Sequence, residues 1–318
     1  MAYTSQQIEA YLDRIALPEA SRTSPVLCGT VSPNSPEGLS FLRTLQRHHL
    51  AAVPFENLSL HYSPSRQIAL DASSVFDKIV GRRRGGYCME VNLLFRTVLH
   101  TLGFDVYSVG GRVNEAIQPM ATSKGWKGPK YDGWNHMVNI VTVKETSYLV
   151  DVANGSSGPH QPLPLEASNE PTHNIGDQWI RLVHGPIAQH TRPDQALWQY
   201  EIRNGEDTTA WTPAYCFTET EFLPEDFAMM NYFVSTHPSS WFTFCIVCVR
   251  MVLDEDGVLV GDLTLFNDRL KRRMGAQAEE IAVFTTEDER VGALESYFHI
   301  SLSELERAAI HRTASAIQ

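Results

Sequence analysis

The segment best suited to chemistry is a cationic, glycine-rich stretch that ends in a cysteine, GRRRGGYC at residues 81–88. An apolar helix is predicted to begin near Cys88, which places the thiol at a helix N-terminus. The positive end of the helix dipole and nearby guanidinium groups both favour the thiolate, which is the nucleophilic form of cysteine. Gly85 and Gly86 allow a tight turn and the close approach of a substrate. Cys88 is therefore a candidate nucleophile, although a small buried side chain is the commoner role of a lone cysteine.

A candidate base and its orienting acid lie further along the chain. A nucleophilic cysteine commonly works with a base, and the base with a carboxylate that orients it. Residues 136–143 (HMVNIVTV) and 147–152 (SYLVDV) are two predicted strands separated by a short polar turn, which is the pattern of a β-hairpin. His136 opens the first strand and Asp151 lies near the end of the second, so cross-strand reach is expected. Each alone is compatible with a strand edge or a turn, but together with Cys88 they predict a Cys-His-Asp triad.

The elements that must position this triad fall into three regions. Residues 1–104 are predicted to be mainly helical, because apolar residues recur there at three- and four-residue spacing. Residues 105–222 are predicted to form short strands in a sheet that closes or nearly closes. Residues 223–318 mix both patterns. With no repeat or low-complexity linker between the regions, we expect an α+β chain whose three parts pack together.

Composition argues against several classes of protein. The 318 residues include 26 Lys and Arg and 37 Asp and Glu, so the net charge is −11 and a general surface for nucleic acid or anionic membrane is not expected. No apolar run approaches the roughly 20 residues that span a bilayer, and the polar start does not resemble a secretory signal. Five cysteines are an odd and sparse set, which fits a reducing compartment. We therefore expect a cytoplasmic protein without nucleic-acid or membrane partners.

A second pair of cysteines has the spacing of metal ligands, but the surrounding sequence argues against a metal site. Cys245 and Cys248 have the spacing of a metal-binding pair. On the predicted strand, an offset of three sends their side chains to opposite faces. The sequence offers no further Cys/His cluster to complete a zinc site, so no metal is expected.

Several motifs resemble those of the arylamine N-acetyltransferases. RGGYCMEVN at 84–92 resembles that family's Arg-Gly-Gly-x-Cys motif, and the strands at 136–138 and 148–152 resemble its histidine and aspartate strands. Further matches occur in the family's order and cover nearly the whole chain: YLDRI at 11–15, VPFENL at 53–58 and STHPSSWF at 235–242. Each match is weak alone, but the ordered set is specific.

The resemblance implies a fold and a reaction. The fold is a helical domain (1–104), a β-barrel domain (105–222) and an α/β lid (223–318), with a cysteine-protease-like arrangement of the triad. The reaction is ping-pong transfer of an acyl group from acyl-CoA to an aromatic amine or hydrazine, with acetyl-CoA or malonyl-CoA as cosubstrate and no tightly bound cofactor. By motif position, Cys88 is the acyl-thioester nucleophile, His136 the base and Asp151 the orienting carboxylate.

The resemblance also implies binding residues. Predicted CoA contacts are Lys124, Lys127, Gly133 and Trp134, in the basic, aromatic loop before His136, together with Thr236 and Ser240. Predicted substrate contacts are Phe55 and Asn154. Glu56 and Arg84 are expected to form an ion pair that braces the cysteine loop.

One departure from the family pattern bears on specificity. After Asp151-Val152 the family typically has Gly-Phe-Gly, whereas this chain has Ala153-Asn154-Gly155. The loss of an aromatic wall and the gain of an amide predict either a narrower acceptor range or a more polar acyl group such as malonyl.

Two other functions remain open from the sequence. A transglutaminase-like protein or a thiol hydrolase also uses Cys, His and Asp in this chain order, but takes the acyl group from an amide. A degenerate relative would only bind CoA or a partner, and its Cys88 would be an ordinary, slowly alkylated thiol.

Overall fold

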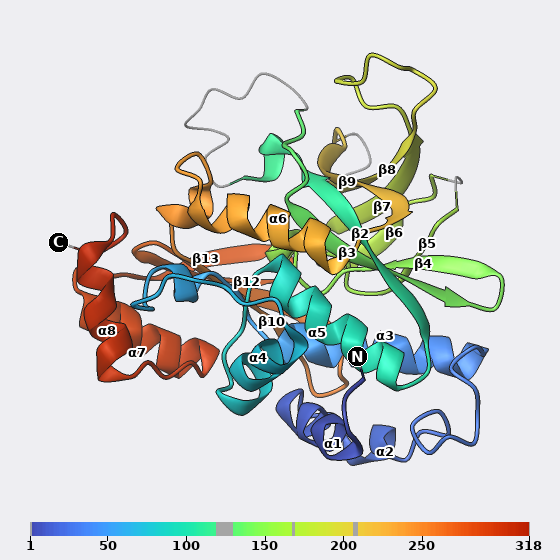
Figure 1. Ribbon diagram of the computed structural model, residues 1–318, viewed down its shortest axis with the longest axis horizontal. Helices are drawn as coiled ribbons and strands as arrows, with labels where there is room; N and C mark the ends of the chain where they lie inside the picture. Colours follow the sequence, from blue (N-terminus) through green and yellow to red (C-terminus); the bar gives the residue numbers. More distant parts are fainter. Residues whose placement is uncertain (1, 119–129, 167–168, 206–208, 318) are drawn as a thin grey trace.

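The computed structural model describes residues 2–118, 130–166, 169–205 and 209–317 (Figure 1). The helices are α1 (Ser5–Arg14), α2 (Glu19–Arg22), α3 (Pro36–Ala52), α4 (Ala72–Phe76), α5 (Cys88–Thr101), α6 (Pro224–Thr236), α7 (Glu287–Phe298) and α8 (Glu304–Ala309). The strands are β1 (Phe55–Glu56), β2 (Asp105–Val113), β3 (His136–Val143), β4 (Thr146–Val150), β5 (Leu163–Pro164), β6 (Thr172–Ile175), β7 (Gln178–Gly185), β8 (Leu197–Asn204), β9 (Thr212–Glu221), β10 (Val247–Leu253), β11 (Leu259–Phe266), β12 (Arg269–Met274) and β13 (Gln277–Val283). The fold is α+β, as the sequence predicted.

Helix α5 is the element that carries the cysteine, and it begins at Cys88 as expected. Tyr87 is its N-cap, and the Glu90 carboxylate accepts a hydrogen bond from the Tyr87 backbone N–H at 3.2 Å. This bond satisfies one of the amides that a helix start would otherwise leave unpaired. Gly103 has φ of +85° just beyond the helix, a conformation that favours glycine and turns the chain into β2. Helix α5 packs against β2 and β3, so its N-terminus is held next to the hairpin.

The middle of the chain forms an antiparallel eight-stranded sheet in the order β5-β4-β3-β2-β9-β8-β7-β6. The predicted hairpin is present, because β3 and β4 pair antiparallel with Asn139 opposite Val150. The sheet curls around its own apolar cluster, which includes Val138, Ile180 and Phe217. Among the described residues no ladder joins β5 to β6, so the expected barrel is an open half-barrel.

The C-terminal part forms a second antiparallel sheet, in the order β1-β10-β11-β12-β13. Its first strand comes from the N-terminal region: Phe55 pairs with Val249, and Glu56 with Cys248. Helix α7 packs on this sheet through a cluster that includes Leu265 and Leu294. The strand predicted to hold both Cys245 and Cys248 begins only at Val247, so Cys245 lies before it, and residues 241–243 form a short 3₁₀ helix.

One apolar cluster joins the three parts of the molecule. It contains Leu42 of α3, Phe95 of α5, Val141 of β3, Met230 of α6 and Met251 of β10. The division of the chain after residues 104 and 222 stays a prediction. Within the described ranges, no helix is both long and apolar enough to cross a membrane.

Candidate active site

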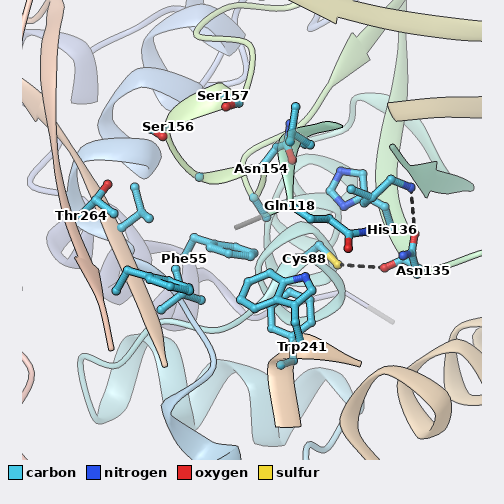
Figure 2. A pocket seen from close by; sticks show the side chains of 18 of the residues that line it. Phe55, Cys88, Gln118, Asn135, His136, Asn154, Ser156, Ser157, Trp241 and Thr264 are labelled. Carbon is cyan, nitrogen blue, oxygen red and sulfur yellow. Dashed lines mark hydrogen bonds between the residues drawn. The ribbon is translucent and has the colours of Figure 1, made fainter. Parts of the chain in front are cut away.

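The Cys88 thiol is buried at the start of α5. The residue is 3 % exposed, and its Sγ donates a long hydrogen bond of 3.7 Å to the backbone oxygen of Asn135 (Figure 2). Asn135 immediately precedes β3, and its side-chain oxygen accepts a hydrogen bond from the Val113 backbone N–H at 2.9 Å. The thiol therefore lies between the N-terminus of α5 and the start of strand β3 in the half-barrel.

The hairpin brings His136 and Asp151 together. Nε2 of His136 and Oδ2 of Asp151 are 2.8 Å apart, and both side chains are buried. This bond leaves Nδ1 as the ring nitrogen available to the thiol, and a hydrogen bond with Cys88 is among the interactions that act on the imidazole. The structure thus brings the three predicted residues into one connected group.

The electrostatics of the pair favour its charged form. Burial lowers the pKa of His136, but the charge of Asp151, its hydrogen bond and the interactions with Cys88 outweigh burial and raise this pKa to about 10. Burial raises the pKa of Asp151, but the charge and hydrogen bond of His136 and further hydrogen bonds hold it below its ordinary value. An imidazolium beside a carboxylate is therefore the stable state near neutral pH.

Asn92, which lies one helical turn after Cys88, is a site residue that the motifs alone did not reveal. Its Nδ2 donates to Oδ1 of Asp151 at 2.9 Å and to the Met137 backbone oxygen at 2.7 Å. Its Oδ1 accepts from the Val152 backbone N–H at 3.1 Å. Residues four apart share a helix face, and this spacing was the signal that could have identified Asn92. The side chain ties α5 to both strands of the hairpin.

A cavity of about 420 Å³ opens next to the thiol. Its described walls are aromatic at Phe55, Trp241 and Phe242, polar at Gln118, Asn135, Asn154, Ser156 and Ser157, and cationic at Arg269 and Lys271, and Cys88 and His136 also line it. In Figure 2, Thr264 lies on the opposite side of this space from Asn135. An apolar cavity with a few converging polar groups is the usual form of a small-molecule site.

Both predicted substrate contacts line this cavity. Phe55 packs edge to face against Phe242, with ring centroids 6.2 Å apart. Asn154 precedes a short 3₁₀ helix, Gly155–Ser157. Its Nδ2 is buried and has no hydrogen-bond partner among the described residues. Asn154 thus lines the cavity and has an amide donor that no described residue uses.

Four of the six predicted CoA contacts fall within the described residues. Lys124 and Lys127 fall outside the described residues. Gly133 is exposed, and the Trp134 ring packs under the Arg112 guanidinium at 4.0 Å. The hydroxyls of Thr236 and Ser240 donate to backbone oxygens of Tyr232 and Val234. The described lining of the cavity includes none of these last four predicted residues, and their contact with CoA stays a prediction.

The glycines of the cysteine loop serve packing within the protein. A Cβ on Gly85 would lie 1.9 Å from the Pro54 backbone oxygen, and one on Gly86 would lie 2.8 Å from Cβ of Glu90. These two positions were expected to make room for a substrate. The structure shows instead that they must be glycine because Pro54 and Glu90 pack directly against them.

The arginines of the loop do not line the cavity that holds Cys88. Arg84 is buried, with Nε 3.6 Å from Oε1 of Glu56 and Nη1 3.0 Å from Oε1 of Glu306. Arg82 also pairs with Glu306, at 2.6 Å. The helix N-terminus and His136, rather than these guanidinium groups, are the features next to the thiol.

Glu56 holds the loop from the other side. Its Oε1 accepts the Gly85 backbone N–H at 3.2 Å, and its Oε2 accepts the Leu58 backbone N–H at 2.5 Å. Burial raises the pKa of Glu56, but Lys78, Arg84 and these two amides lower it by more than burial raises it. The net pKa is below its ordinary value, so the carboxylate stays charged. The expected Glu56–Arg84 pair is present, within a larger network.

Comparison with known proteins places the chain in a family. A sequence model of the family described as N-acetyltransferase matches residues 38–307. The chain belongs to the arylamine N-acetyltransferase family. Its fold is similar to that of the Salmonella typhimurium arylamine N-acetyltransferase, with a TM-score of 0.75, 25 % identity and coverage of 97 % of this chain and 98 % of that one. The Mycobacterium marinum enzyme in complex with CoA gives a TM-score of 0.72 at 28 % identity, over 96 % of this chain and 99 % of that one.

Two relatives by sequence differ in the acyl group that their names give. The chain is 40 % identical to the N-malonyltransferase FDB2 of Fusarium pseudograminearum, over 96 % of this chain and 91 % of that one. It is 29 % identical to human arylamine N-acetyltransferase 1, over 93 % and 94 %. The protein is thus an acyl-CoA-dependent acyltransferase, which separates it from the thiol hydrolases and transglutaminases that the sequence pattern also fitted.

Proposed function

We propose that this enzyme transfers an acyl group from acyl-CoA to an aromatic amine or hydrazine through a thioester on Cys88. The observation that carries the proposal is the buried contact of Cys88, His136 and Asp151 at the wall of the 420 Å³ cavity. A nucleophile, a base and an orienting carboxylate are the groups that acyl transfer through cysteine requires.

The first half-reaction loads the enzyme. His136 holds the proton of the thiol, and the Cys88 thiolate attacks the carbonyl carbon of the acyl-CoA thioester. A bond forms between Sγ and the acyl carbon, the bond to the CoA sulfur breaks, and His136 gives its proton to the departing CoA thiolate. Asp151 keeps the ring oriented and stabilises the imidazolium form.

The second half-reaction releases the acyl group to the acceptor. The amine nitrogen attacks the thioester carbon on Cys88, and the bond from that carbon to Sγ breaks. His136 accepts the proton that the amine loses, which restores the starting pair of thiolate and imidazolium. Phe55, Trp241 and Phe242 provide apolar walls against which an aromatic acceptor can pack.

We further propose that malonyl-CoA is the preferred donor, with acetyl-CoA as a second one. The 40 % identity to a fungal N-malonyltransferase supports this choice. Asn154 supports it as well, because its spare Nδ2 donor in the cavity wall suits the free carboxylate of a malonyl group. An acetyl group offers no such acceptor.

Intact mass spectrometry tests the mechanism. Mixing the enzyme with malonyl-CoA or acetyl-CoA, without an amine, is expected to add one acyl group, and adding an arylamine is expected to remove it. The Cys88→Ala variant is expected to gain no acyl group. An acyl adduct that persists in Cys88→Ala, or the absence of any adduct on the wild-type chain, would contradict the proposal.

We also propose a cytoplasmic location and small molecules alone as partners. The five cysteines are all free thiols, which supports a reducing compartment. The net charge of −11 supports the absence of nucleic-acid and anionic-membrane partners.

A further inference from the structure

A second cavity, of about 310 Å³, lies away from the thiol and shares no described lining residue with the first. Its lining residues come from the ends of α1, α3, β10 and α7 and from Arg83 of the cysteine loop. Five basic side chains line it: Arg14, His48, Arg83, Arg250 and His299. The other described lining residues are apolar, and none is acidic. Three of these five are arginines, and this basic cluster contrasts with the chain's net charge of −11.

The guanidinium groups here bind neutral partners. Arg14 donates to the backbone oxygens of Ile79, Ala52, Arg83 and Arg84, at 2.9, 2.5, 3.3 and 3.1 Å. Arg250 donates to the backbone oxygens of Tyr297 and Ala51, at 3.1 and 3.4 Å. Carbonyl groups satisfy N–H donors but do not cancel a charge.

Helix ends explain only part of this arrangement. The last turns of α1, α3 and α7 meet at the cavity, and a helix C-terminus carries the equivalent of roughly half a negative charge. Three such ends balance about half of the charge on three arginines. The surplus positive charge remains for a ligand.

The acidic turn that follows β10 does not supply the missing charge. Oδ1 of Asp254 accepts hydrogen bonds from the Asp256 and Val258 backbone N–H groups, at 3.0 and 2.8 Å. These bonds hold the carboxylate in its own turn, and the described lining of the cavity does not include it.

The titration behaviour of the cluster agrees with an unbalanced positive potential. Burial and then the repulsion of Arg83 and Arg250 lower the pKa of Arg14 to about 10. Burial lowers the pKa of His299, and Arg250, Arg83 and Arg14 lower it further. A bound anion would reverse these repulsions.

We propose that this cavity binds a phosphate or pyrophosphate group, with Arg83, Arg250 and His299 as its ligands. Guanidinium groups present paired N–H donors that match phosphate oxygens. The Arg83 side chain forms no hydrogen bond or ion pair with the described residues, so its donors are available to a ligand. A water molecule occupies about 30 Å³ in the liquid, so the cavity has room for a pyrophosphate and its hydration.

The site is connected to the cysteine loop through the backbone. Arg14 binds the carbonyl oxygens of Arg83 and Arg84, and this segment continues into Gly85, Gly86 and Cys88. A bound anion offsets the repulsion between Arg14 and Arg83 and thereby stabilises the segment that leads to the thiol.

Titration calorimetry and thermal unfolding with inorganic pyrophosphate, at ionic strength matched with sodium chloride, test the site. We expect saturable binding and a raised melting temperature for the wild-type protein. We expect Arg83→Glu to weaken binding by about tenfold or more, as for the loss of one charge-assisted contact. Arg192→Glu is the matched control, because Arg192 is exposed and its ion pair among the described residues is with the neighbouring Asp194. Equal binding by wild type and Arg83→Glu, or no saturable binding, would overturn the proposal.

Two further measurements separate this site from the cosubstrate site and identify the source of the anion. The KM for acyl-CoA is expected to stay unchanged in Arg83→Glu. If the KM for acyl-CoA instead rises by the same factor as the dissociation constant of pyrophosphate, the cavity belongs to the CoA site and the proposal is wrong. Titrations with phosphate, pyrophosphate and a nucleoside diphosphate then rank a free anion against a nucleotide, and equal absence of binding for all three would contradict the site.

Discussion

The side-chain amide of Asn92 donates a 2.9 Å hydrogen bond to the Asp151 oxygen that does not contact His136. The same amide binds the backbone of the histidine strand at Met137. One residue of α5 thus fixes the carboxylate relative to the helix that carries Cys88. The triad is held together by this cross-link as well as by the His136–Asp151 bond.

We expect Asn92→Leu to lower both stability and the rate of acylation. The substitution leaves Oδ1 of Asp151 with the Ala153 backbone N–H and removes the donor to Met137. A lost buried partner of this kind costs about 1–3 kcal/mol. Denaturant unfolding and single-turnover acylation measure the two effects. Asn174→Leu is the control: this amide binds Gly158 and Gln178 in the half-barrel, so its loss should lower stability alone. Equal acylation by the two variants would remove the positioning role of Asn92.

We expect Cys88→Ala to lower acyl transfer by about a thousandfold or more while the protein stays folded. The thiol is the proposed site of the thioester, and its long bond to Asn135 contributes little to stability. Cys216→Ala is the matched control, because burial raises the pKa of that thiol to about 12 and it lies outside the described cavity lining. Arylamine acylation and circular dichroism are the measurements. A fully active Cys88→Ala enzyme would end the proposed mechanism.

The local parts of this arrangement were predictable from the sequence. The start of α5 at Cys88 follows from a glycine-rich segment that runs into an apolar helical pattern. The hairpin that carries His136 and Asp151 follows from two strand patterns separated by a short turn. Both depend on interactions between residues close in sequence.

The nonlocal parts were not predictable. Strand β1 has two residues and pairs with β10, nearly two hundred positions later, so no periodicity reveals it. Glu306, the second carboxylate that pairs with Arg84, also lies more than two hundred positions after it in the sequence. Of the two tryptophans, Trp134 stacks against Arg112 and Trp241 lines the cavity beside Cys88, although the sequence drew attention to Trp134 only. Which aromatic residue faces the cavity depends on packing between elements.

The charge state of the His136–Asp151 pair predicts how stability depends on pH. The pKa of His136 is raised from 6.5 to about 10, so its contribution to stability is complete below pH 6.5 and is lost as the pH rises through about 10. The pKa of Asp151 is lowered, so its contribution is present above its ordinary pKa and is lost only in more acidic solution. We expect the stability difference between wild type and Asp151→Asn to be largest between these limits and to shrink towards pH 10. Urea unfolding across this range measures it, and a difference that grows from neutral to alkaline pH would contradict the charged pair.

Glu56→Gln tests the bracing of the cysteine loop. The buried carboxylate faces Lys78 and Arg84, which keep Glu90 and Glu306 as partners, so the substitution removes one of two balancing charges from each cation. The neutral amide also weakens the charge-assisted hydrogen bonds from the Leu58 and Gly85 backbone N–H groups. Such bonds contribute about 1.5–3 kcal/mol, and we expect the melting temperature and activity to fall together. Glu279→Gln is the control, because Glu279 forms an exposed pair with Arg272 on β12 and its loss should change neither. Unchanged melting of Glu56→Gln would remove the bracing role.

Asn154→Phe tests the donor preference. The substitution removes the spare Nδ2 donor and restores the aromatic residue that the family pattern has at this position. If the amide binds the malonyl carboxylate, kcat/KM for malonyl-CoA should fall by about tenfold or more, the loss expected for one hydrogen bond to a charged group, while the value for acetyl-CoA stays constant or rises. Thr264→Val is the control, because it removes a hydroxyl from the same cavity on the side opposite Asn135. A parallel fall for both donors would mean that Asn154 shapes the cavity without selecting the acyl group.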